Sequence, residues 1–367
     1  MIPRNDPDIL VVGAGPAGSS AAVAAAGAGL EVLLIEAKAR IGERPHCGEF
    51  VPRKLFEEFH LDNRVTYQPV EVMETHVLSG DTVLGCEFRS TDKTETFSPG
   101  FIIDRARFDR TLARDAAWVG AVVVSDARLV RKEGAAWVVC TDGSERRLHP
   151  KLVIAADGAF SAVAAALGLP RPDYLHGVQV EVPLVRECDR TFVLLHRDIR
   201  HGYAWLFPKG RTANVGLGVS PGDGPGARIL LDRTLILLES WGMIRRGRLA
   251  VTSGIIPVSG LRKKLVVENA VFCGDAAGLT HPITGAGIAQ AVFSGTEAGL
   301  AAAKAVKSGE AAPLEAYEHD IFVRYKGVTS HAAAKRKAME HSWDLGDLSE
   351  ASRQWWIAFK GYRRRVR

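Results

Sequence analysis

The fold is decided by residues 8–18, which read DILVVGAGPAG. The first five form an apolar run of strand length, and the last six have the pattern GxGxxG. An alanine-rich helix is predicted over residues 16–26, and a second apolar strand over 30–35 ends at Glu36. A glycine turn that joins a strand to a helix and leads to a second strand predicts a βαβ unit of a parallel sheet.

This turn has the residues needed to bind a dinucleotide. Gly13 permits the tight turn, Gly15 lets the backbone approach a pyrophosphate, and Gly18 lets the helix pack on the sheet. The helix N-terminus offers free N–H groups, and Glu36 can accept ribose hydroxyls. A purely structural glycine turn is the alternative. The residues predicted to bind here are Gly13, Gly15, Pro16, Ala17, Gly18, Glu36 and Ala37.

Two later segments favour FAD over NAD. Residues 153–158 (VIAADG) and 271–278 (VFCGDAAG) are strands that end in Asp-Gly and Gly-Asp, and residues 281–288 (HPITGAGI) open a long helix predicted over 283–306. Asp275 can bond ribityl hydroxyls, and glycine-exposed N–H groups at a helix N-terminus can stabilise negative charge on a reduced flavin. Each segment alone could be an ordinary strand-to-turn junction. The predicted cofactor residues are Ala156, Asp157, Gly158, Gly274, Asp275, Pro282, Gly285, Ala286, Gly287 and Ile288.

The middle of the chain has a different pattern. Alternating strands are predicted over 179–182, 191–195, 203–207 and 212–219, which is typical of antiparallel sheet. We therefore expect an α/β fold: a Rossmann-like FAD-binding domain, an inserted and mainly antiparallel β-sheet substrate domain, and a helical C-terminal region. The FAD-binding domain is expected to comprise residues 1–75, 101–170 and 263–310, the substrate domain 76–100 and 171–262, and the C-terminal region with its basic tail 311–367.

The sequence resembles the p-hydroxybenzoate hydroxylase superfamily of flavoproteins over residues 8–306, and within it the geranylgeranyl reductases. The resemblance is carried by the Ala-Asp-Gly and Gly-Asp-Ala segments, the Cys47-Gly48-Glu49 loop, the Arg-x-x-Phe-Asp pattern at Arg105, and Tyr203-x-Trp205-x-Phe-Pro. It implies FAD-dependent reduction of C=C bonds in isoprenoid chains. It also implies contacts to FAD from Cys47, Gly48, Arg105 and Val123.

The sequence departs from this family at several points. Phe50 stands where the family usually has glycine, Arg200 stands where it has proline, and the C-terminal region is short. These differences bear on the substrate more than on the cofactor.

Cys47, Tyr203 and Trp205 are the candidate catalytic residues. Reduction of an alkene needs a proton as well as a hydride, and a thiol beside the flavin could supply or relay it; a buried structural cysteine is the alternative. Tyr203, Trp205 and Phe207 alternate along one strand, so they share a face that forms either a substrate wall or a core face. His46 and His281 could move protons, although a lone histidine is more often structural.

Composition narrows the class of protein. The net charge is +5 without a nucleic-acid module, and the five cysteines contain no CxxC pair, so neither nucleic acid nor a zinc or iron–sulfur site is expected. No run is apolar enough to span a bilayer, and no signal peptide is recognised, so we expect a cytoplasmic protein. An apolar spacing at Leu348, Trp355, Trp356 and Phe359 precedes the basic residues Lys360, Arg363, Arg364, Arg365 and Arg367. It fits an interfacial helix at a membrane surface or a lid on the substrate domain.

Three functions compete. The first is a reductase of C=C bonds in an isoprenoid or other apolar small molecule. The second is an aromatic or quinone-type monooxygenase of the same superfamily, and the third is a flavin-binding electron-transfer partner without catalysis. Because a second GxGxxG is missing, we expect electrons from transiently bound NAD(P)H or from a ferredoxin-like protein.

Overall fold

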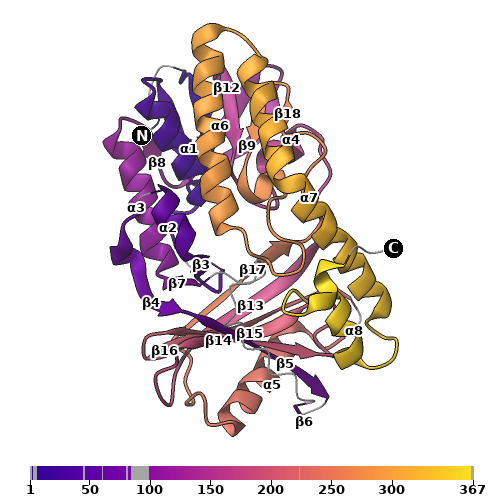
Figure 1. The fold of residues 1–367 in the computed structure, drawn as a ribbon. Coiled ribbons are helices and arrows are strands. Elements are labelled where there is room, and N and C mark those ends of the chain that lie inside the picture. Colours follow the sequence, from indigo (N-terminus) through magenta and orange to yellow (C-terminus); the bar gives the residue numbers. More distant parts are fainter. Residues whose placement is uncertain are drawn as a thin grey trace.

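The computed structural model describes residues 2, 6–43, 46–59, 61–79, 82–83, 99–222 and 224–364. Arg365 and Arg367 of the basic tail lie outside the described residues. The chain forms a mixed α/β structure in which a parallel sheet covered by helices lies above a second, larger sheet (Figure 1). The predicted fold class is confirmed.

The six-stranded sheet carries the glycine turn. Five of its strands are parallel and fully apolar, which suits a sheet buried on both faces. The antiparallel β18 completes one edge. The order is β18 (Val266–Val267), β19 (Ala270–Phe272), β12 (Leu152–Ala155), β1 (Ile9–Val12), β2 (Val32–Ile35) and β8 (Val122–Val124).

Helices α1 (Pro16–Gly27) and α6 (Ile288–Ser308) pack very closely on each other. A Cβ added at Gly295 would lie 2.0 Å from the backbone oxygen of Ala17, and one at Gly299 would lie 2.3 Å from that of Ala21. Only glycine permits this approach. The close packing places α6, which residues 281–288 lead into, beside α1, the helix that follows the GxGxxG turn.

The seven-stranded sheet has the predicted antiparallel texture, except that β5 and β14 pair in parallel. Helix α5 (Ala227–Ser240) packs on one face through an apolar cluster, and the C-terminal helices pack on the other (Figure 1). The order is β17 (Ala250–Pro257), β13 (Tyr174–Pro183), β16 (Thr212–Val219), β15 (Tyr203–Lys209), β14 (Arg190–His196), β5 (Val72–Ser79) and β6 (Thr82–Val83). Strand β5 thus crosses the domain boundary expected after residue 75.

Two three-stranded sheets and short helices complete the frame. One sheet, β3–β7–β4, lies between the two large sheets and carries α3 (Arg105–Trp118) directly after β7. The other, β11–β10–β9, flanks the parallel sheet. Their bounds are β3 (Phe50–Pro52), β4 (Thr66–Val70), β7 (Gly100–Ile103), β9 (Ala127–Glu133), β10 (Ala136–Thr141) and β11 (Ser144–Leu148), with α2 (Arg53–Phe59), η1 (Asn63–Val65) and α4 (Ala162–Ala166).

The C-terminal region packs on the seven-stranded sheet as a lid. After α7 (Ala312–Ser342), the aromatic residues of α8 (Leu348–Trp355) and its flank are buried, and Trp356 Nε1 donates to Thr75 Oγ1 at 3.1 Å. The short turn η3 (Lys360–Arg363) follows. The apolar residues expected on an interfacial helix therefore face the protein. In the described part of the chain, no helix has the length and hydropathy to cross a bilayer.

The third FAD segment differs from the prediction in one respect. Helix α6 begins at Ile288, five residues later than the expected start at Ile283. Gly285 has a φ of +68°, outside the helical region, and Gly287 is the N-cap. Residues 281–287 are therefore a loop, which is held by internal hydrogen bonds such as those from the N–H of Gly285 to the His281 oxygen and from the N–H of His281 to the Ala286 oxygen, both at 2.9 Å.

Candidate functional site

The GxGxxG turn is built around backbone contacts that only glycine allows. Gly13 has a φ of +99°, and a Cβ there would lie 2.5 Å from the backbone oxygen of Ala156. A Cβ at Gly18 would lie 1.8 Å from the backbone oxygen of Gly13. The turn is thereby locked against Ala156, at the end of the neighbouring strand β12, so the first and second predicted segments meet here.

Gly15 faces open space. It is the N-cap of α1, no side chain caps the helix there, and a Cβ added at Gly15 would have no atom within 4 Å. Pro16 occupies the first turn, where it needs no N–H partner. An uncapped helix N-terminus beside free space fits a pyrophosphate, because the free N–H groups and the helix dipole both favour an anion.

Glu36 lies at the end of β2, within reach of the same turn. Its carboxylate accepts hydrogen bonds from the backbone N–H groups of Ala14 at 2.9 Å and Lys38 at 3.0 Å. Ala37 is exposed beside it, and Val123 pairs with Leu34 on the adjacent strand β8. These residues surround the end of the turn where the adenosine half of a dinucleotide would lie.

The third segment meets the first at α1. A Cβ at Gly274 would lie 2.8 Å from the Cβ of Ala17, and Gly274 donates its N–H to Ser294 Oγ of α6 at 2.9 Å. The turn η2 (Gly274–Ala277) follows. Asp275 Oδ1 accepts the Thr280 hydroxyl at 2.5 Å, and burial raises the pKa of this carboxyl.

The two carboxylate oxygens of Asp157 differ in their hydrogen bonding. Its Oδ2 accepts the N–H of Val163 at 3.1 Å at the start of α4, while its Oδ1 is buried without a hydrogen-bond partner. Gly158 follows with a φ of +81°. A buried acceptor without a partner is costly unless a ligand or water satisfies it, so this atom fits a bound polar group.

A cavity of about 790 Å³ opens between the two large sheets. Its walls come from the loop at residues 46–50, the face of β15, the loop that precedes α6, and the C-terminal lid. Of the predicted site residues it collects Cys47, Gly48, Tyr203, Trp205, Phe207, Gly285, Ala286, Gly287 and Ile288, together with His46 and His281. Gly287 caps α6 without any side-chain hydrogen bond, so a second uncapped helix N-terminus faces this cavity.

The three aromatic residues of β15 form one wall. Tyr203 and Trp205 are in edge-on contact at 5.8 Å between ring centroids, and Trp205 and Phe207 lie 6.4 Å apart. The Tyr203 hydroxyl donates to the backbone oxygen of Thr284, and Trp205 Nε1 donates to Gln179 Oε1 at 3.0 Å. Because the Tyr203 hydroxyl and Trp205 Nε1 already donate hydrogen bonds within the protein, the rings present apolar surface to the cavity.

Cys47 also lines the cavity, on the loop that packs against the β15 aromatic residues. Its Sγ accepts the backbone N–H of Glu49 at 3.2 Å. Burial raises the pKa of the thiol, and the neighbouring Arg105 guanidinium opposes that rise. Arg105 itself is paired with Asp109 at 3.0 Å. The thiol is thus protonated at neutral pH, which a proton donor requires.

The two candidate histidines are both neutral. Burial lowers the pKa of His46 to about 4, and its two buried ring nitrogens have no hydrogen-bond partner among the described residues. Burial and the neighbouring His331 lower the pKa of His281 to about 4. His281 Nδ1 accepts the N–H of Thr284 at 3.2 Å, so its proton is on Nε2, which donates to the Tyr362 hydroxyl at 3.1 Å.

The structure adds three residues that were absent from the predicted site. Glu49, Lys209 and Asn214 form a buried polar cluster beside Cys47. Two signals in the sequence could have found it: Glu49 belongs to the Cys-Gly-Glu loop, and Lys209 continues the alternation of Tyr203, Trp205 and Phe207 on β15.

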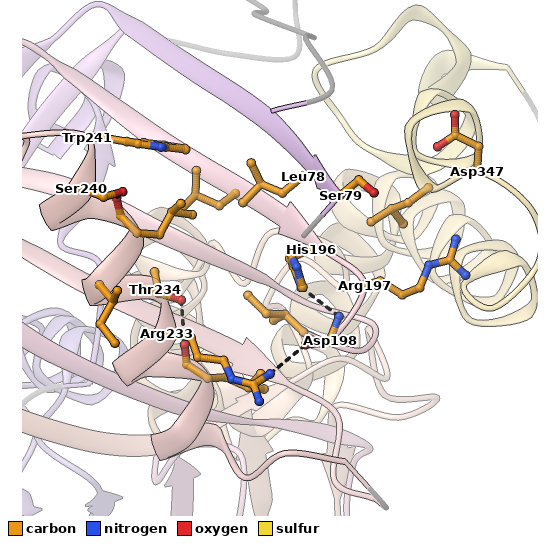
Figure 2. Close-up of a pocket in the computed structure, with 16 residues that line it drawn as sticks. Leu78, Ser79, His196, Arg197, Asp198, Arg233, Thr234, Ser240, Trp241 and Asp347 are labelled. Carbon is orange, nitrogen blue, oxygen red and sulfur yellow. Dashed lines mark hydrogen bonds and ion pairs between the residues drawn. The ribbon is translucent and has the colours of Figure 1, made fainter. Parts of the chain in front are cut away.

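A second cavity, of about 770 Å³, lies on the other face of the seven-stranded sheet, between β14 and α5 (Figure 2). Two of its charged side chains pair with each other, since Arg233 donates to Asp198 at 2.9 Å, and the backbone N–H of Asp198 donates to His196 Nδ1 at 3.1 Å. No predicted cofactor or substrate residue lines the described part of its wall. The candidate site is therefore the cavity between the sheets.

Comparisons with known proteins identify the family of the chain. Residues 6–196 match the family described as "FAD binding domain". A digeranylgeranylglycerophospholipid reductase of Methanocaldococcus jannaschii is 33% identical over 311 residues, which cover 82% of this chain and 78% of that protein. A geranylgeranyl bacteriochlorophyll reductase-like structure from Thermoplasma acidophilum has a TM-score of 0.84 and 26% identity, over 97% of this chain and 92% of that one. A flavin-dependent brominase, with a TM-score of 0.69, 18% identity, and 96% and 93% coverage, shares the fold.

Fold and site together define an FAD-dependent oxidoreductase. The chain belongs to the geranylgeranyl reductase family of FAD-binding proteins. The residues present fit FAD: open space beside Gly15 at one uncapped helix N-terminus, a buried free oxygen on Asp157, and a second uncapped helix N-terminus at Gly287.

Proposed function

We propose that this protein reduces C=C bonds in an isoprenoid or similarly apolar lipid chain. The observation that carries the proposal is the cavity of about 790 Å³, which is lined by the β15 aromatic residues, the Cys47 loop and residues Gly285–Ile288. Such a space suits a long apolar chain beside a flavin ring. Relatives that share about a third of the sequence are named as reductases of geranylgeranyl lipids.

Each wall has a separate task in this proposal. FAD, when bound, supplies hydride chemistry. The N–H groups at the start of α6, with Ala286, Gly287 and Ile288 at the cavity, favour negative charge at the cofactor's pyrimidine edge. Tyr203, Trp205 and Phe207 hold the alkene against the cofactor and exclude water. Cys47 delivers the proton that, together with one hydride, saturates the double bond.

Electrons must enter from outside in this scheme. The chain contains a single GxGxxG, so we propose NAD(P)H that binds transiently, or a ferredoxin-like protein, as the donor. We also propose a peripheral contact with the membrane that holds the lipid. Val328 is 57% exposed on α7 and lines the cavity, as does the cation Arg363. An apolar rim next to a basic residue suits an anionic bilayer surface.

Anaerobic mixing tests the proposed reaction. The FAD-loaded protein is reduced with dithionite, freed of excess reductant, and mixed without oxygen with polyprenyl lipids or with aromatic acids. Reoxidation of the flavin by a polyprenyl lipid, and not by the acids, is expected. Reoxidation that requires oxygen and yields a hydroxylated aromatic product would instead identify a monooxygenase.

A further inference from the structure

Strand β15 is fastened to the cofactor-binding half of the molecule at both ends. Tyr203, at the start of the strand, donates to the backbone oxygen of Thr284 in the loop before α6. Lys209, at its last residue, places Nζ 2.7 Å from Glu49 Oε2 in the Cys47 loop. Tyr203, Trp205, Phe207 and Lys209 alternate along the strand, so the two anchors belong to the face that lines the cavity.

Glu49 is the centre of the second anchor. It is only 4% exposed, and its carboxylate has three donors. Oε1 accepts the backbone N–H of Arg105 at 3.0 Å, at the start of α3, and Oε2 accepts Asn214 Nδ2 at 2.6 Å and Lys209 Nζ at 2.7 Å. The carboxylate therefore joins the Cys47 loop to α3 and to the β15–β16 hairpin.

The backbone of Glu49 is in the left-handed region, with a φ of +68°. A residue with a side chain rarely adopts this conformation unless its surroundings impose it. In this conformation the N–H of Glu49 points at the sulfur of Cys47 and donates to it at 3.2 Å. The side-chain anchors of Glu49 thus hold the backbone group that contacts the candidate proton donor.

Among the described residues, Glu49 is the nearest carboxylate partner of Lys209. The Lys209 ammonium lies 4.9 Å from the centroid of the Tyr67 ring and 3.9 Å from Glu181 Oε2, and the other oxygen of Glu181, Oε1, accepts the Thr212 hydroxyl at 2.7 Å. The Lys209 side chain is 13% exposed and that of Glu49 is 6% exposed. Removal of either charge leaves the other buried without its main partner, which is costly.

We propose that Glu49 and Lys209 are a positioning pair that fixes the Cys47 thiol and the β15 aromatic wall relative to each other at the cavity. Neither is a catalytic residue. The pair acts through the N–H of Glu49 on Cys47 and through the anchored end of β15. The proposal deepens the proposed function, since Cys47 is the proton donor there, but thiol reactivity can test it without a lipid substrate.

The test measures alkylation of Cys47 in the FAD-loaded protein with iodoacetamide between pH 6 and 10, resolved by peptide mass spectrometry. The thiolate is the form that reacts with iodoacetamide. The midpoint of the pH–rate profile therefore reports the pKa of the Cys47 thiol, whereas the plateau rate at high pH reports how easily the reagent reaches the sulfur. Arg105, Glu49 and Tyr203 are the titratable groups that face the thiol, and all three are retained in the Lys209 variants.

In Lys209→Met the Glu49 N–H is expected to leave the sulfur. The midpoint of the pH–rate profile then moves to higher pH. At pH values below the midpoint the alkylation rate falls by about tenfold, which corresponds to a rise of about one in the pKa of the thiol. Lys209→Arg keeps the cation and should stay within about twofold of the parent rate. Lys132→Met is the matched control, because Lys132 also pairs with a glutamate, Glu268 at 2.8 Å, and also lies over an aromatic ring, Trp137.

A Lys209→Met profile that coincides with the parent and with Lys132→Met would overturn the proposal. If Lys209→Met does not fold, Lys209→Gln is compared with Lys209→Arg in the same assay and with the same two outcomes. The proposed lipid reduction is scored separately by anaerobic flavin reoxidation. An unchanged midpoint therefore counts against the positioning pair alone, and absent reoxidation in the parent protein counts against the reductase.

Discussion

Gly48 lies directly against the ring of Phe207. A Cβ added at Gly48 would be 2.7 Å from two carbons of that ring, closer than real Cβ contacts come. At Gly48, the Cys47 loop therefore touches the aromatic wall of β15 through its backbone. The contact lies at the cavity, because Gly48 and Phe207 both line it.

Gly48→Ala should force these two elements apart. Overpacking of this kind costs about 1–3 kcal/mol, so the free energy of unfolding in urea is expected to fall by that amount. Phe207→Leu removes the ring, and the double variant should recover most of the loss, because the two residues are coupled. If the losses in the free energy of unfolding of the two single variants simply add in the double variant, the contact between Gly48 and Phe207 is not the cause of the destabilisation.

Gly15→Ala separates cofactor binding from folding. A Cβ at Gly15 meets no atom of the protein, so the apoprotein should keep its melting temperature. The same Cβ would occupy the space proposed for the pyrophosphate, so the affinity for FAD should fall by at least about tenfold, or about 1.4 kcal/mol. Titration of the apoprotein with FAD, followed by flavin fluorescence, measures this.

Gly27→Ala is the control for that experiment. Gly27 belongs to the same helix, and its added Cβ also meets nothing within 4 Å, but it lies at the opposite end of α1. It should bind FAD like the parent. Equal affinities for FAD in the Gly15 and Gly27 variants would rule out a pyrophosphate at the α1 N-terminus.

The local chemistry of the fold was predictable from the sequence, whereas contacts between distant segments were not. The GxGxxG turn, helix α1 and the alternation on β15 each follow from a short sequence pattern. Helix α6 was expected to begin at Ile283 but begins at Ile288, because Gly285 adopts a positive φ. The periodic pattern of apolar residues does not reveal that backbone conformation. The aromatic C-terminus left two interpretations open, and tertiary packing decided for the lid.

The Glu49–Lys209 pair shows the same limit. Glu49 and Lys209 lie far apart along the chain. Their pairing depends on the left-handed backbone conformation of Glu49, which a pattern of side chains does not predict. Sequence patterns identified the Cys-Gly-Glu loop and the aromatic strand as site elements. They did not show that a carboxylate and an ammonium join them.

Cys47→Ser should slow substrate reduction without loss of FAD. A serine hydroxyl is a far weaker acid than a thiol, and general acid catalysis typically contributes about 100-fold or more. Because burial raises the pKa of Cys47, the parent rate should stay level near neutral pH and decline only in the alkaline range, where the proton is lost. Cys140→Ser, on β10 outside the cavity, is the control. Turnover equal to the parent in Cys47→Ser would remove the thiol from the mechanism.

His281→Asn should make the protein less sensitive to acid. The native pKa of His281 is about 4 and the ordinary value is 6.5, so the unfolded chain binds the proton more readily. The neutral histidine is compatible with the fold at pH 7, and stability is lost as the pH falls from 6.5 towards 4. By pH 5 this loss is about 2 kcal/mol, and the variant should lack it.

Urea unfolding at pH 7 and pH 5 measures this difference. His149→Asn is the control, because His149 is exposed on the surface. If the parent and His281→Asn lose the same free energy between the two pH values, His281 is not the buried neutral group that the structure indicates.

The most direct test of the central claim is a single anaerobic turnover with analysis of the product. The reduced, FAD-loaded protein is mixed with one equivalent of a geranylgeranyl lipid, and the lipid is then examined by mass spectrometry. The account predicts a product heavier by two hydrogen atoms for each flavin reoxidised. A lipid recovered unchanged beside fully reduced flavin, or a product that gains an oxygen atom only after air is admitted, would contradict it.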